Sequence, residues 1–190
     1  MPVLREQLDA AFSPRTVAVV GSRRVDNYTW LRNMSDFKGK LYSVQVDPND
    51  IAGIEEMGIP NYKRIVDIPD QVDYVVVAVP RNVVPIVLKD AIAKGVKTVH
   101  MYTSGFAETR SEEGIRLQQQ ITQMAQEAGV LVIGPNCMGV FNPEVGMRFR
   151  EGQEVDKIGS VTIISQSGAH ASSLTQATQT NGIGINRCVS

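Results

Sequence analysis

Short runs of consecutive apolar residues recur along the chain, and each is followed by a longer segment with apolar residues at helical spacing. These runs lie at residues 16–20, 41–46, 74–79, 98–102 and 130–133. Because their apolar residues are consecutive rather than alternating with polar ones, both faces of each predicted strand are expected to be buried. The pattern therefore predicts parallel strands in a sheet that helices cover on both sides.

Two of the intervening segments place their apolar residues on one stripe of a helix. The first stripe consists of Val84, Val87, Leu88, Ala91 and Ile92, and the second of Leu117, Ile121, Met124, Ala125 and Ala128. This spacing is typical of a helix that packs one side on a core. Strand and helix alternate along the chain, so the predicted fold class is α/β, with a Rossmann-like, doubly wound parallel sheet.

The ends of these two helices carry residues that commonly start or stop helices. Asn82 is predicted to cap the first helix, and Thr109, with Glu112 three residues on, to form a capping box for the second. Gly95 and Gly129 are predicted to end them, because glycine readily adopts the left-handed conformation found after many helices.

A polar, charged stretch at residues 148–157 interrupts the pattern and marks a predicted domain boundary. A strand at 160–164, a helix at about 167–180 and a strand at 185–189 follow it. One strand-helix-strand unit cannot bury its own apolar surface. The chain is therefore expected to be a piece of a longer protein, or to dock its tail on the first domain.

Composition and charge exclude several classes of partner. Among 190 residues, 20 acidic and 19 basic side chains leave a net charge of −1, so nucleic acid is not an expected partner. The longest apolar run, residues 75–80, is too short for a bilayer span, and the first twelve residues lack a secretory apolar stretch. Cys137 and Cys188 cannot form a disulfide framework and fit a reducing compartment, so the expected location is the cytoplasm.

Ligands of an open parallel sheet bind at the carboxyl ends of the strands, and the loop after the first strand is a candidate site. Gly21 allows a sharp turn, after which a helix is expected to present free N–H groups to an anion. Arg23 and Arg24 add positive charge. The alternative is a tight turn with two solvated arginines.

The same loop lacks the GxGxxG glycines of a dinucleotide-binding fingerprint. Asp47, 26 residues after Gly21, nevertheless stands where an acidic residue binds the adenosine ribose in nicotinamide enzymes, which keeps NAD as a rival ligand. The alternative is that Asp47 belongs to a turn and caps the next helix.

The later strands end in loops with further candidate residues. Arg81 is expected to point toward the same crevice, and Gly105 to permit a close approach of backbone and ligand. Glu108 could serve chemistry, although stabilising a helix start is the favoured interpretation. Asn136, within GPNCMG, can be aimed at a phosphate, and Ser167, within SQSGA, precedes a helix suited to an anion.

Other reactive residue types carry less weight. Cys137 is expected to be a buried thiol rather than a nucleophile, and His100, inside a strand, a core residue. His170 could neighbour a phosphate, but a solvated or packed side chain is favoured. The histidines and cysteines lack metal-ligand spacing, and the absence of GxSxG disfavours a hydrolase.

Six motifs occur in the order and approximate spacing of one family: VAVVGS, DIP, VDYVVVAVP, SGFAE, GPNCMG and SQSGA. Across essentially its whole length, the chain resembles the NDP-forming acyl-CoA synthetases, which include the α subunit of succinyl-CoA synthetase. The resemblance implies a Rossmann-like CoA-binding domain at residues 1–150. It also implies that residues 151–190 are a linker and the truncated first strand-helix-strand unit of a flavodoxin-like domain.

In that family an acyl phosphate forms, a histidine carries the phosphoryl group, and CoA takes the acyl group. The resemblance assigns CoA contacts to Gly21, Ser22, Arg23, Arg24, Val79, Pro80, Arg81, Ser104, Gly105, Phe106, Pro135 and Asn136, and phosphate contacts to Ser167, Gly168 and Ala169.

The family's phosphohistidine and its ATP-grasp domain find no counterpart in these 190 residues. The chain alone is therefore expected to be inactive, and to act as the CoA-binding portion of an oligomeric acid–CoA ligase. The alternatives are a non-catalytic CoA-binding or CoA-sensing module and an NAD-dependent oxidoreductase.

Overall fold

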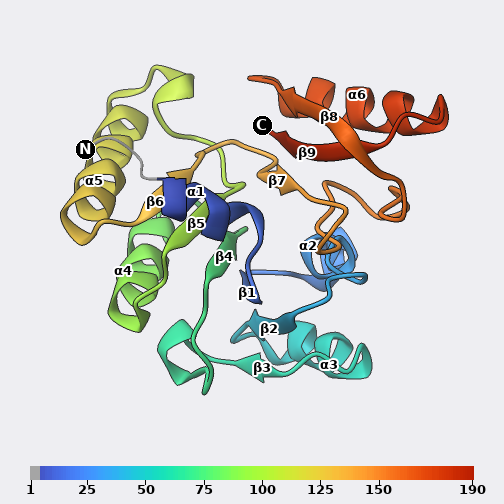
Figure 1. The fold of residues 1–190 in the computed structure, drawn as a ribbon. Coiled ribbons are helices and arrows are strands. Elements are labelled where there is room, and N and C mark those ends of the chain that lie inside the picture. Colours follow the sequence, from blue (N-terminus) through green and yellow to red (C-terminus); the bar gives the residue numbers. More distant parts are fainter. Residues whose placement is uncertain (1–4) are drawn as a thin grey trace.

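A computed structural model describes residues 5–190, so the first four residues of the predicted first domain lie outside the described residues. Six parallel strands form the main sheet in the order β3-β2-β1-β4-β5-β6 (Figure 1). The strands are β1 (Thr16–Val20), β2 (Lys40–Val44), β3 (Asn61–Tyr62), β4 (Tyr74–Val77), β5 (Thr98–Met101) and β6 (Leu131–Ile133). The reversal of strand order at β1 and β4 is that of a doubly wound sheet, which confirms the predicted Rossmann-like fold.

Helices cover both faces of this sheet (Figure 1). They are α1 (Arg5–Phe12), α2 (Thr29–Arg32), α3 (Pro48–Glu56), α4 (Val84–Lys94) and α5 (Glu112–Ala128), with 3-10 turns η1 (Arg24–Asp26), η2 (Ile65–Asp67) and η3 (Ala107–Thr109). Ala18 and Val75 face a core shared with α4 and α5, whereas Val17 and Tyr74 face a second core with Trp30. Successive strand residues thus enter opposite cores, which explains their consecutive apolar pattern.

The helix ends confirm the predicted stops but not the predicted starts. Gly95 and Gly129 end α4 and α5 in the left-handed conformation, with φ of 79° and 66°. The cap of α5 is Ser111, whose hydroxyl accepts from the Gly114 N–H (3.1 Å), so the predicted capping box at Thr109 is wrong. Asn82 does not cap α4 either, because that helix begins after Val83 with a proline in its first turn.

The prediction of a helix directly after the loop at residues 21–24 is also wrong. The chain makes only the 3-10 turn η1, after which Asn27 and Tyr28 take left-handed conformations (φ 54° and 51°) and the single turn of α2 follows. Tyr28 is buried, and its hydroxyl donates to the Asp50 carbonyl (3.2 Å). A Cβ on Gly53 would lie 2.2 Å from that hydroxyl, so glycine in α3 is what admits the ring. Docking Tyr28 on α3 therefore breaks the helix.

The last part of the chain forms a small second sheet in the order β7-β9-β8. Strands β8 (Ile158–Ile164) and β9 (Ile185–Val189) are parallel and joined by α6 (Gly168–Thr180), while β7 (Val140–Phe141) pairs antiparallel with β9. The predicted strand, helix and strand in this region are confirmed to within two residues. Since β7 belongs to the segment before residue 150, the tail shares a sheet with the preceding chain.

Side-chain contacts fix this tail on the first unit. Arg187 Nη2 pairs with Glu144 Oε2 (2.7 Å), and Glu151 Oε1 lies 3.8 Å from Arg32 Nη1. Docking of the tail was one of the two outcomes left open by the sequence. Among residues 5–190, no helix combines the length and apolar character needed to cross a bilayer.

Candidate functional site

A cavity of about 530 Å³ opens at the carboxyl ends of β1 and β2, between them and α4. Its walls are mainly valine and isoleucine side chains, including Val46 and Ile86, which are 66% and 68% exposed. Charged groups at this cavity come from the segment after β3 and from α4. An apolar hollow with a few polar groups suits a flat heterocycle that carries charged substituents.

Gly21 and Val79, both predicted CoA contacts, line this cavity together. Gly21 has φ 89°, and a Cβ there would lie 2.5 Å from Val79 Cγ1 and 2.8 Å from the Ala78 carbonyl oxygen. The Gly21 N–H donates to the Val44 carbonyl (3.2 Å). Only glycine therefore allows the turn after β1 to pass between the ends of β2 and β4.

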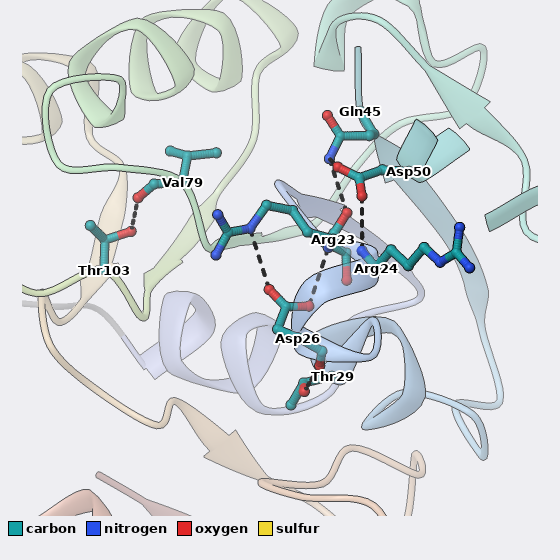
Figure 2. Close-up of polar contacts among 9 residues, drawn as sticks. Arg23, Arg24, Asp26, Thr29, Gln45, Asp50, Val79 and Thr103 are labelled. Atoms are coloured by element: carbon teal, nitrogen blue, oxygen red, sulfur yellow. Dashed lines mark hydrogen bonds and ion pairs between the residues drawn. The ribbon is translucent and has the colours of Figure 1, made fainter. Parts of the chain in front are cut away.

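Two side chains that the sequence analysis did not assign, Gln45 and Asp50, hold the loop at residues 21–24 (Figure 2). Gln45 Nε2 donates to the Ser22 carbonyl (3.0 Å) and to Asp50 Oδ2 (3.1 Å). Asp50 Oδ1 accepts from the Arg24 backbone N–H (2.8 Å). Both side chains are nearly buried. In the sequence these two residues could have been found as a polar residue, Gln45, directly after a buried strand and an acidic residue, Asp50, in the next predicted helix.

Carboxylates already occupy the backbone amides that were expected to be free for an anion. Asp26 Oδ1 accepts from the Arg23 N–H (3.2 Å), and Asp50 accepts from that of Arg24. The Arg23 and Arg24 amides are therefore not free for an anion. Positive charge remains on the two guanidinium groups.

The two arginines point in different directions in Figure 2. The Arg23 side chain extends toward the side of Val79, and its Nε lies 3.5 Å from Asp26 Oδ2. The Arg24 side chain extends the opposite way, past Asp50. Arg23 is thus the arginine that lies on the side of the loop after β4.

Arg81, after Val79 and Pro80, ties the loops after β4 and β5 together. Its Nη1 donates to the Gly105 carbonyl (2.9 Å), and its Nη2 pairs with the Glu113 carboxylate. Gly105 has φ 101°, and a Cβ there would lie 2.9 Å from Arg81 Cδ. The structure therefore brings these two predicted residues together, but the Arg81 charge is compensated within the chain.

The loop after β5 contributes backbone rather than large side chains. The Thr103 hydroxyl, which the sequence analysis missed, donates to the Val79 carbonyl (2.7 Å; Figure 2). Glu108 accepts from the Gly105 N–H (2.6 Å) at the start of η3, as its favoured interpretation required. Phe106 is fully buried in the core, so its side chain faces away from solvent, whereas Ser104 is exposed.

The loop at residues 134–139 joins the first sheet to the second. Asn136 is exposed with φ 55°, and its N–H donates to the Thr103 carbonyl (3.0 Å), which places it beside the loop after β5. Pro135 lines a separate, smaller hollow of about 230 Å³ against α5. The predicted Pro135 and Asn136 therefore lie near Ser104 but outside the cavity that Gly21 lines.

Cys137 and His100 are core residues, as expected. Burial raises the pKa of the Cys137 thiol above its ordinary value, which opposes the thiolate needed for nucleophilic attack. His100 Nε2 hydrogen-bonds the Cys137 carbonyl (2.8 Å), and burial lowers the pKa of the imidazole to about 4. A Cβ on Gly139 would lie 2.6 Å from the ring, so this glycine makes room for it.

A second candidate site lies at the start of α6. The Ser167 hydroxyl caps the helix by accepting from the His170 N–H (3.4 Å), and Ser165 Oγ accepts from the Ser167 N–H (3.2 Å). Amides in the first turn of an α-helix have no intrahelical acceptor, which leaves those of Gly168 and Ala169. A Cβ on Gly168 would lie 2.5 Å from Met138 Cγ. Residues 5–190 contain no acidic, histidine or cysteine cluster able to hold a metal ion.

The fold and the cavity define a nucleotide-binding domain of the doubly wound class. Residues 15–143 match the family described as CoA binding domain, and the chain belongs to that family. This membership supports CoA, and does not favour NAD, as the bound ligand. Asp47 agrees, because its side chain caps α3 by accepting from the Asn49 N–H (2.9 Å).

Several longer proteins are similar to this chain. It is 35% identical over 188 residues to the α subunit of acetate–CoA ligase (ADP-forming) I from Pyrococcus furiosus, which covers 96% of this chain and 40% of that subunit. It is 33% identical over 180 residues to an ADP-forming acetate–CoA ligase from Methanocaldococcus jannaschii, covering 93% of this chain and 24% of that protein.

A solved structure is similar as well. The apo form of the dinucleotide-forming acetyl-coenzyme A synthetase 1 of Candidatus Korarchaeum cryptofilum superposes with a TM-score of 0.83 at 34% identity, covering 96% of this chain and 39% of that one. The chain thus spans about a quarter to two fifths of the length of these relatives. The resemblance inferred from the six motifs is confirmed.

Proposed function

We propose that this chain binds CoA at the carboxyl ends of β1, β2 and β4, with the adenine in the 530 Å³ cavity. The observation that carries the proposal is the coincidence of an apolar hollow with the matched CoA-binding family over residues 15–143. Val46 and Ile86 are large apolar side chains left exposed at this hollow, and a bound base would cover them.

Arg23 supplies the charge for the pyrophosphate. Its guanidinium extends toward the side of Val79, and its Nε is oriented by Asp26, which leaves the two terminal nitrogens for phosphate oxygens. The pantetheine arm runs along the loops after β4 and β5, where Pro80, Ser104 and Asn136 lie. Arg81 acts there by holding the Gly105 backbone in place.

The chain is further proposed to be the CoA-binding portion of an ADP-forming acyl-CoA ligase. In this role the missing nucleotide chemistry belongs to an ATP-grasp domain or subunit, and the assembly is oligomeric and cytoplasmic. The start of α6 would receive a phosphate through the Gly168 and Ala169 amides, with Ser167 fixing the helix start. The reaction class is taken from the similar acetate–CoA ligases of Pyrococcus furiosus and Methanocaldococcus jannaschii.

Thermal denaturation with and without ligand tests the binding proposal. CoA at about 100 times its dissociation constant should stabilise the chain by about 2.7 kcal/mol, whereas NAD and ATP at equal concentration should stabilise it less. Calorimetric titration with CoA then gives the dissociation constant and the stoichiometry. Stabilisation by NAD but not by CoA would overturn the proposal and restore the oxidoreductase alternative.

A further inference from the structure

The rim of the cavity carries an uncompensated positive charge. Four charged side chains line the hollow: Lys63, Arg64, Lys89 and Asp90. The Asp90 carboxylate is already engaged, because Oδ1 pairs with Arg64 and Oδ2 accepts from the Ile65 N–H (2.7 Å). Within the described part of the chain, Lys63 and Lys89 have no ion-pair partner. The rim therefore has two ammonium groups available for an anion.

These two lysines come from elements that are far apart in sequence. Lys63 follows β3, and Lys89 lies in α4. Both are exposed, yet both line the same apolar hollow. An anion at this rim would meet positive charge from two elements, which favours a dianionic group over a single carboxylate.

The chemistry of CoA supplies such a group close to the base. Its 3′-phosphate is attached to the adenosine ribose, whereas the pyrophosphate leaves from the 5′ carbon. If Arg23, beside Gly21, receives the 5′ pyrophosphate, a base in the hollow leaves its 3′ substituent to the remaining charged rim. That rim is the one formed by Lys63 and Lys89.

We propose that Lys63 and Lys89 bind the 3′-phosphate of CoA and make the cavity select CoA over dephospho-CoA. This inference rests on the proposed function, since it assumes that the adenine occupies the hollow. It assigns the 3′-phosphate to lysines outside the family motifs. Arg23 and Arg24 are left without that role.

Calorimetric titration of the wild-type chain and three variants with CoA and with dephospho-CoA tests the inference. The variants are Lys63→Ala, Lys89→Ala and the double substitution, and Lys97→Ala is the matched control. Lys97 is exposed but precedes β5, so it lies at the opposite, amino-terminal edge of the sheet. None of these exposed side chains contributes to a core, so the variants are expected to fold.

The wild-type chain should bind CoA at least about tenfold more tightly than dephospho-CoA, as expected for charge-assisted contacts with one phosphate. The double variant should lose this preference while its affinity for dephospho-CoA changes by less than about twofold. Lys97→Ala should behave like the wild type. Raising the salt concentration should reduce the preference of the wild type, because exposed charges are screened.

Three results would overturn the inference alone. Wild-type binding of CoA without preference over dephospho-CoA would mean that the 3′-phosphate is not recognised. An equal loss of affinity for both ligands in the double variant places the lysines on the pyrophosphate instead. A wild-type chain that binds neither ligand would instead overturn the proposed function. A preference that survives the double substitution assigns the 3′-phosphate elsewhere and also overturns the inference.

Discussion

At the scale of single residues, the two adjacent arginines of the first loop have different surroundings. Arg23 extends toward the side of Val79 and is oriented by Asp26, whereas Arg24 points the opposite way, past Asp50. Sequence alone assigned both to the ligand, because neighbouring residues of one kind cannot be separated without the backbone. Here the turn η1 sends their side chains in opposite directions.

Substitution of each arginine by glutamine should reveal this difference. Arg23→Gln is expected to weaken CoA binding about tenfold, the lower end of the range for a charge-assisted hydrogen bond, because the side chain is half exposed. Arg24→Gln should change the affinity by less than about twofold, since its backbone N–H still donates to Asp50. Calorimetric titration of both proteins with CoA measures the two effects. A larger loss for Arg24→Gln would reverse the assignment.

His100 makes the stability of the fold depend on pH. Its folded-state pKa of about 4 lies below the ordinary 6.5, because burial disfavours the charged imidazole. Between these values the unfolded chain binds the proton more readily, so stability is full above pH 6.5 and declines as the pH falls toward 4. Lowering the pH from 6.5 to 5 should cost about 1.5 kcal/mol of unfolding free energy.

Urea denaturation at the two pH values measures this cost. Asp70, whose pKa is held below its usual 3.8 by hydrogen bonds from Lys40 and Tyr42, stays ionised in both and does not contribute. His170→Ala should keep the decline, while His100→Leu should abolish it whatever its absolute stability. A decline of equal size in His100→Leu would assign the effect to other groups.

At the scale of secondary-structure elements, the sequence predicted what depends on local pattern. The strands at residues 16–20 and 98–101 follow from apolar runs, and the end of α5 follows from Gly129. β3, with only Asn61 and Tyr62, carries no such run and was missed. The failed helix after Arg24 depends on Tyr28 docking against α3, a contact between segments that local pattern does not encode.

The residues of the candidate site also fall into those that local sequence motifs predicted and those that depend on packing between distant segments. Gly21 and Val79 were predicted because they belong to motifs that follow strands. Gln45 and Asp50 were not assigned, although their hydrogen bonds hold the first loop in place. Lys89 was also missed, because its place on the rim depends on how α4 packs across the strand ends.

Because Asp50 belongs to α3 and holds the loop at residues 21–24, we expect substitutions of Asp50 to affect CoA binding. Asp50→Ala removes the acceptor of the Arg24 N–H and a partner of Gln45, and should cost about 1 to 3 kcal/mol of stability. It should also weaken CoA binding, because the loop at residues 21–24 loses its anchor. Asp50→Asn keeps one acceptor oxygen and should retain most of the affinity. Urea denaturation first shows whether each variant is folded, and titration with CoA then measures the binding site. Equal affinity for CoA in Asp50→Ala and wild type would contradict the coupling.

At the scale of the whole molecule, the tail at residues 151–190 packs against the CoA-binding unit and is fixed to it. β7 pairs with β9, Arg187 pairs with Glu144 (2.7 Å), and Glu151 pairs with Arg32 (3.8 Å). The start of α6 is consequently held against Met138, in the same loop that contains Asn136. The proposed phosphate site at α6 and the proposed CoA site therefore both adjoin this loop.

This arrangement predicts how the chain behaves in the ligase reaction. Given ATP, an organic acid and CoA, the 190-residue chain alone should form no acyl-CoA and should gain no acid-labile phosphate on histidine. The chain contains two histidines. His100 is buried, and His170 is exposed in the first turn of α6, where a side chain lies along the helix rather than at its mouth. Neither is placed to receive and return a phosphoryl group.

Labelling with ATP carrying a tagged γ-phosphate, in the presence of an ATP-grasp subunit from one of the similar ligases, provides the measurement. We expect no label on the wild-type chain. His170→Ala should bind CoA with unchanged affinity, because the proposed anion site at α6 uses the Gly168 and Ala169 amides and not the imidazole. Label that appears in the wild type and disappears in His170→Ala would make His170 the phosphoryl carrier. The phosphate would then be held by the imidazole and not only by the helix start, and the chain would contribute to the transfer step itself.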